Sequence, residues 1–181
     1  MKKSIGLLLF VAVMTASLSC STVSSDPEEQ FIYYMNRLDK VKLDELLTED
    51  FVLSRSFADY RNDRASFLGE YLQSAKDVNG VFNIMERSGN TFVIEDQSDY
   101  FKYLDVDYPN WKLTVNTRKG KVYSAVIDTI ENHYLFVREV KAKEIAFDTW
   151  RKKAYPNDVS ATGFKGTALT MKRMKEYSGS H

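Results

Sequence analysis

The chain has 181 residues, of which 44% are hydrophobic and 13% aromatic. This composition is typical of a folded domain with a sizeable core and excludes an intrinsically disordered chain. Lys+Arg and Asp+Glu both number 25, so the formal net charge is zero and no basic surface for nucleic acid is indicated. The sequence contains one cysteine, which excludes an intrachain disulfide and a cysteine-based metal site.

Residues 1–19 have the pattern of an export signal. Lys2 and Lys3 form a positively charged start, and an apolar run follows over residues 5–14. This run is too short to cross a bilayer, which requires about 20 apolar residues in a helix. We therefore predict a signal peptide rather than a transmembrane helix.

The residues around Cys20 suggest that it carries a lipid. The small residues Ser17 and Ser19 precede Cys20 and resemble a lipobox, although an ordinary secretory peptide with a chance cysteine is the alternative. A lone thiol in an exported protein tends to form intermolecular disulfides, and attachment of a lipid removes the thiol. We expect a bacterial lipoprotein of the cell envelope, held to a membrane through Cys20, with residues 20–26 as a polar tether.

Three helices are predicted after the tether. Asp26 can cap the first helix and Pro27 suits its first position, and apolar residues then recur at helical spacing. A second, short helix is predicted over about residues 43–50. A third helix is predicted from Asn62 or Asp63 to about residues 79–80.

After Gly80 the apolar period changes from helical spacing to alternation, which favours β-strands. Extended segments are predicted over residues 81–87, 91–96, 100–106, 111–116 and 121–128. Short turns join them, so we expect an antiparallel meander, since parallel strands need long crossover connections. Helical signals return from about residue 136, break at residues 155–158 and resume near residues 167–177.

Residues 43–56, 62–72 and 111–129 resemble the nuclear transport factor 2-like (cystatin-like) superfamily, including a hairpin turn at Gly120-Lys121. That superfamily includes ketosteroid isomerases, scytalone dehydratase and polyketide cyclases. The resemblance implies an α+β domain over residues 27–130, in which a curved antiparallel sheet wraps around N-terminal helices as a cone with a pocket at its open end. Residues 131–181 lie outside this basic fold and are expected to form a helical extension that packs on the same domain.

The resemblance also implies a tyrosine on the first helix and carboxylates on the sheet. Tyr34 (or Tyr33) matches the tyrosine, whereas residues 51–56 and 110–112 hold no acid where the isomerases have one. A dehydratase of the scytalone type implies a pair of pocket histidines, but the chain has His133 and the C-terminal His181. Both departures weigh against these two reactions.

Two aspartates are the candidate acids. Asp96 shares a strand face with Phe92 and Ile94 and lies at the rim of the pocket if that face is concave; otherwise it is a solvated acid at a strand end. Asp128 shares a face with apolar residues and is either a buried acid with a raised pKa or a surface acid before a loop.

Candidate ligand-binding residues are aromatic or aliphatic, although the same residue types at strand alternation also build cores. They are Tyr34, Phe92, Ile94, Tyr103 and Trp111. Neither a metal nor a cofactor is expected, because His133 has no second histidine nearby and no glycine-rich phosphate loop is present.

Two functional hypotheses follow. The favoured one is a non-catalytic, lipid-anchored domain whose pocket binds a small apolar molecule or a partner. The alternative is a small-molecule isomerase, dehydratase or hydrolase that uses Asp96 or Asp128 as a base and Tyr34 as a hydrogen-bond donor. Exposed Val93 and Tyr123 are also compatible with a homodimer formed through the sheet.

Overall fold

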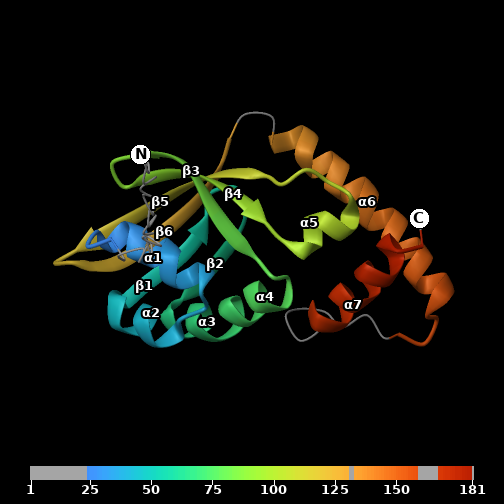
Figure 1. Ribbon diagram of the computed structural model, residues 1–181, viewed down its shortest axis with the longest axis horizontal. Coiled ribbons are helices and arrows are strands. Elements are labelled where there is room, and N and C mark those ends of the chain that lie inside the picture. The colour runs from blue at the N-terminus through green and yellow to red at the C-terminus, as the bar shows by residue number, and fades with distance from the viewer. Residues whose placement is uncertain (1–23, 131–132, 159–166, 181) are drawn as a thin grey trace, which may run out of the picture.

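A computed structural model describes residues 24–130, 133–158 and 167–180. The predicted signal peptide and Cys20 lie outside these ranges. The chain is an α+β protein with a curved, open, six-stranded mixed sheet, helices against one face and a group of helices at one end (Figure 1). None of the helices within the described ranges has the length and hydropathy needed to cross a bilayer.

The first and third N-terminal helices begin where the sequence predicts, whereas the second begins at Lys40 rather than near residue 43. The helices are α1 (Pro27–Asn36), α2 (Lys40–Leu46) and a continuous helical stretch of α3 (Arg64–Ser66), the π-helix η1 (Phe67–Tyr71) and α4 (Leu72–Asp77). The Asp26 carboxylate caps α1 by accepting a hydrogen bond from Glu28 N at 3.0 Å. The predicted end of the second helix near residue 50 is wrong, because Leu47 already pairs with Val122 in the sheet.

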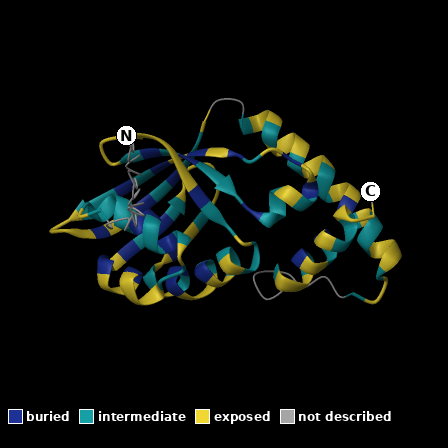
Figure 2. Ribbon diagram, viewed as in Figure 1, coloured by how far each residue is buried: buried dark blue, intermediate teal, exposed yellow. Residues whose placement is uncertain are grey.

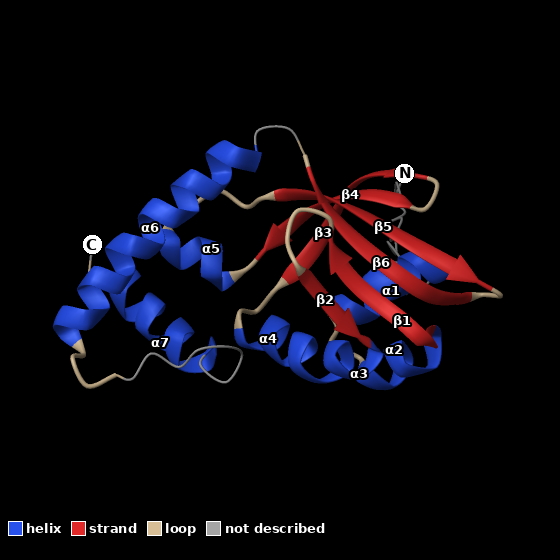
Figure 3. Cartoon of the chain, turned by 180° about the vertical axis from the view of Figure 1, so that it is seen from behind, coloured by secondary structure: helices blue, strands red, loops and turns tan. Residues whose placement is uncertain are grey.

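The sheet has the strand order β2-β1-β6-β5-β4-β3 (Figure 3). Its strands are β1 (Leu47–Arg55), β2 (Tyr60–Asp63), β3 (Val81–Ser88), β4 (Thr91–Gln97), β5 (Asn110–Arg118) and β6 (Lys121–Thr129). The predicted antiparallel meander is confirmed for β3 to β6. The expectation of a wholly antiparallel sheet is wrong, because β1 pairs with β6 in parallel and the helices and strands between them provide the long crossover that this requires.

Residues 100–106 were predicted to be extended, which is wrong for most of this segment. Asp99–Leu104 form helix α5, and Asp105 ends the helix in the left-handed region with a φ of 55°. This segment does not pair in the sheet. Buried Leu104 and Val106 instead face helices α6 (His133–Ala154) and α7 (Thr167–Ser178).

Two apolar clusters hold these elements together. The main core lies between the sheet and helices α1 to α4, with the rings of Phe31, Phe51 and Phe67 packed at centroid distances of 5.1–5.9 Å. The second cluster joins α5, α6 and α7 and has few members (Leu104, Val106, Phe147, Met171 and Met174). Figure 2 shows the difference, since buried positions are dense along the sheet and sparse along α6 and α7.

Candidate functional site

A cavity of about 440 Å³ lies at one end of the sheet, where β4 ends and β5 begins. Its lining residues come from both the sheet and the surrounding helices. They are Met35, Asn36, Arg55, Tyr60, Tyr71, Ser74, Ala75, Val78, Gly80, Phe82, Asp96, Ser98, Tyr100, Phe101, Trp111 and Ile127. The walls are largely apolar and aromatic, with a few polar groups, which is the usual character of a small-molecule site.

Asp96 is the acid of this cavity. Its backbone N–H donates to the carbonyl oxygen of Pro109 at 2.9 Å, and its carboxylate accepts a hydrogen bond from the Trp111 indole N–H at 3.3 Å. Burial raises the pKa of the Asp96 carboxyl from 3.8 to about 6, although the Trp111 hydrogen bond and the positive charge of Arg55 both lower it. Asp96 therefore exchanges a proton within the range of ordinary environmental pH.

Tyr71 supplies a neutral hydroxyl to the same cavity. Its ring stacks on Phe67 with a centroid distance of 5.2 Å, and burial together with the negative charge of Asp96 raises the pKa of the phenol. Because it stays protonated, the Tyr71 hydroxyl is available as a hydrogen-bond donor. The hydroxyl of Tyr100, on α5, is directed away from the cavity and donates a hydrogen bond to Glu144 of α6.

Arg55 is the last residue of strand β1. It is exposed to solvent and lines the cavity. Its guanidinium carbon lies 4.5 Å from the ring centroid of Tyr60, another lining residue on β2. This cation–π contact holds the flat guanidinium in place without using its N–H donors.

The structure places the candidate site residues from the sequence in different environments. Asp96 and Trp111 line the cavity, whereas Phe92 and Ile94 are fully buried in the main core. Phe92, Ile94 and Asp96 share one face of β4, as expected, and the cavity begins where that face leaves the core. Tyr103 lies on α5, beside the second cluster, and donates a hydrogen bond to Asp99 at 3.3 Å.

The expected pairing of Tyr34 with an aspartate does not occur. Tyr34 packs at the edge of the main core with its ring against Tyr33, because it is Met35 and Asn36 of α1 that reach the cavity. The Asp128 carboxylate instead accepts hydrogen bonds from Ser56 Oγ and from Thr129 N, and these keep the pKa of Asp128 below its usual value.

Of the lining residues, Asp96 and Trp111 were candidates from the sequence, and the missed residues that matter most for the chemistry are Arg55, Tyr60 and Tyr71. Tyr71 has the same helical spacing as the core residues of its helix, so periodicity alone gives it no special role. Arg55 and Tyr60 lie on either side of the turn between β1 and β2, a pairing that no local pattern in the sequence indicates.

No protein-family model and no curated protein matches the chain. Among solved structures, it is similar to an NTF2-like protein of unknown function from Cytophaga hutchinsonii, with a TM-score of 0.42, 13% identity and coverage of 64% of this chain and 96% of that one. It is also similar to a putative polyketide cyclase from Sinorhizobium meliloti (TM-score 0.48, 13% identity, 56% of this chain and 93% of that one). A third similar structure is a bacterial protein with a cystatin-like fold from Silicibacter pomeroyi (TM-score 0.45, 14% identity, 75% and 95%). These likenesses concern the arrangement of helices and strands and carry no argument about what this chain binds.

Proposed function

We propose that the cavity binds a small molecule with an apolar, ring-sized body and a hydrogen-bond donor that faces Asp96, without converting it. The observation that carries this proposal is a single acid in an otherwise largely apolar wall of a cavity of about 440 Å³. Sites of about 300–1,000 Å³ with apolar walls and a few convergent polar groups are typical for ligands of this size.

We further propose that the protein is exported and anchored to a membrane through a lipid on Cys20. The support is the signal pattern of residues 1–19 together with the place where the chain enters the domain. Asp26, before α1, lies beside Arg87 at one end of the sheet, whereas Asn36, at the end of α1, lines the cavity at the other. An anchor upstream of Asp26 would therefore attach the domain at the end of the sheet opposite to the cavity.

Mass spectrometry of the chain purified from membranes tests the anchor. A lipid-modified N-terminal Cys20 is expected, and the Cys20→Ser variant is expected to lose both the lipid and the membrane association. An unmodified Cys20 in the membrane fraction overturns the anchor and leaves the cavity proposal untouched.

A second candidate function is acid–base catalysis, and the proton affinity of Asp96 favours it. A carboxyl with a pKa of about 6 is suited to act as a general base near neutral pH, and the protonated Tyr71 hydroxyl lies in the same cavity. Turnover of a bound molecule that is lost in Asp96→Asn is the outcome that would favour catalysis over binding alone.

Isothermal titration calorimetry of the full-length chain with 2-naphthol tests the binding proposal. Ala75 lines the cavity, so Ala75→Phe fills it and is expected to abolish saturable binding. Ala65→Phe adds the same side chain at an exposed position of α3 and serves as the matched control, with binding expected to match the wild type. Equal binding by Ala75→Phe, with its circular dichroism unchanged, would contradict the proposal.

A further inference from the structure

The charged groups of the cavity are few and lie on different strands. Among the described residues that line it, Arg55 is the one cation and Asp96 is the one acid. They form no ion pair with each other, and the Arg55 side chain makes no hydrogen bond or ion pair with any other described residue, although its charge lowers the pKa of Asp96. Both groups thus retain capacity for a ligand.

The Arg55 side chain is nevertheless held in position. The guanidinium carbon lies over the Tyr60 ring, 4.5 Å from its centroid, and this contact restricts the side chain while leaving its N–H donors free. An arginine fork fixed in this way matches the two oxygens of a carboxylate and loses little conformational entropy when it binds one. This distinguishes Arg55 from Arg87, whose donors are already used by Asp26, Glu29 and Gly89.

Arg55 and Asp96 lie on strands that are not neighbours in the sheet. β6 and β5 lie between β1 and β4, so the cavity floor separates the two groups. Ile127, which is in register with Arg55, and Trp111 of β5 line the cavity between them. The cavity volume of about 440 Å³ leaves room for one or two rings over this apolar floor.

We infer that the cavity is selective for a hydroxylated aromatic or alicyclic carboxylate, with its carboxylate on Arg55, its ring on Trp111 and Ile127, and its hydroxyl donating to Asp96. This inference rests on the proposed function and names the ligand class. A single fork suits a monoanion, because a dianionic phosphate has no second cation among the described lining residues and is repelled by ionised Asp96.

Two probes that share a ring system test the inference by calorimetry. 6-Hydroxy-2-naphthoate carries both polar groups, whereas 2-naphthol lacks the carboxylate. A carboxylate on an arginine fork is expected to make 6-hydroxy-2-naphthoate bind the full-length wild type at least about 10-fold more tightly. In Arg55→Met this advantage is expected to disappear, so that the two probes bind the variant with equal affinity.

Arg61→Met is the matched control, because Arg61 lies on β2, is exposed and is absent from the cavity wall. It is expected to keep the preference for the carboxylate. If both probes bind the wild type equally, or if Arg55→Met keeps the preference, the inference fails while the binding proposal stands. If neither probe binds, the binding proposal fails as well. Thermal melting of Arg55→Met verifies that the variant is folded.

Discussion

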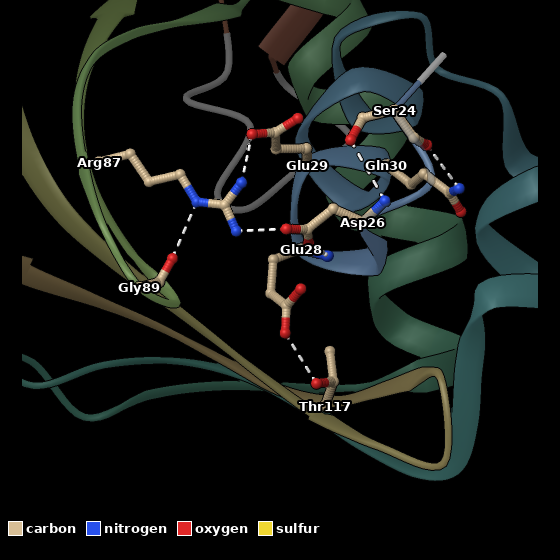
Figure 4. Close-up of polar contacts among 8 residues, drawn as sticks. All are labelled: Ser24, Asp26, Glu28, Glu29, Gln30, Arg87, Gly89 and Thr117. Carbon is tan, nitrogen blue, oxygen red and sulfur yellow. Dashed lines mark hydrogen bonds and ion pairs between the residues drawn. The ribbon is translucent and has the colours of Figure 1, made fainter.

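Charged side chains are paired at one end of the sheet and unpaired at the other. At the end where the chain enters, Arg87 reaches Asp26 and Glu29, and Thr117 donates to Glu28 at 2.7 Å (Figure 4). At the cavity end, Asp96 and the arginine of β1 line one space without pairing. The same sheet thus has a closed end with paired charges and an open end where charges are held apart.

The pKa shifts express this difference in terms of stability. Hydrogen bonding to Glu28 and the contact with Arg87 lower the pKa of Asp26 to about 2, so its ionised form favours the folded state. Burial raises the pKa of Asp96 to about 6, so its ionised form disfavours the folded state. The comparison indicates that the unpaired polar groups at the cavity end lower the stability of the folded state but remain available to a ligand, as is common in binding sites.

The largest expected effect comes from loosening the cavity end alone. Phe147 is buried in the second cluster, which holds α5 and therefore the cavity residues Tyr100 and Phe101. Phe147→Ala is expected to cost about 3–5 kcal/mol through lost burial and the cavity it leaves. Hydrogen exchange should speed up in α5, α6 and α7 and stay slow in β5, which belongs to the main core.

Ile145→Ala on the same helix is the control, since Ile145 is 58% exposed and its loss should change little. Faster exchange throughout β5 and β6 in Phe147→Ala would contradict the idea that the two ends open separately.

Asp96→Asn is expected to stabilise the protein at neutral pH. The pKa of an aspartate carboxyl is 3.8 when it is free in water and about 6 for Asp96 in the folded state, so the folded state binds more protons between these values. Wild-type stability is therefore reduced progressively as pH rises from about 4 through 6, and removing the charge recovers up to about 3 kcal/mol above pH 6. Urea unfolding at pH 4 and pH 7.5 measures the gain, which should be present at pH 7.5 and nearly absent at pH 4.

Asp128→Asn is the matched control, because the Asp128 pKa is lowered rather than raised, mainly by the hydrogen bond from Ser56. It is expected to destabilise at pH 7.5. A stabilisation by Asp96→Asn of the same size at both pH values would mean that the charge of Asp96 is not its cause.

Features of the fold that depend on neighbouring residues in the chain were predicted correctly. They are the helix cap at Asp26 and the alternation of apolar residues after Gly80. The helix at residues 99–104 was missed because the extended pattern of the preceding strands was continued through it, whereas its packing against α6 and α7 depends on residues far along the chain. The parallel pairing of β1 with β6 joins segments far apart in the chain, which periodicity does not report.

The candidate site was predictable only in part for the same reason. Asp96 continues the buried face of Phe92 and Ile94, so alternation placed it at the rim of the core. Arg55 and Tyr71 reach the cavity from β1 and η1, and their convergence on Asp96 depends on the curvature of the sheet. A cavity formed by ten different elements leaves no compact motif in the sequence.

The smallest expected effect is at the closed end, with Arg87→Ala. The pair with Asp26 is about one-third exposed on both sides, so screening limits its contribution, and we expect a loss of about 1 kcal/mol at pH 6. Because the Asp26 pKa is lowered to about 2, its contribution is complete above about pH 4 and is lost as pH falls toward 2. Arg118→Ala, whose pair with Asp50 is more exposed, is the control and should cost less. Urea unfolding is measured at pH 6 and pH 2.5. An equal loss from Arg87→Ala at both pH values would show that packing of the arginine side chain, whose guanidinium carbon lies over the Phe92 ring, stabilises this end of the sheet rather than pairing with the carboxylates.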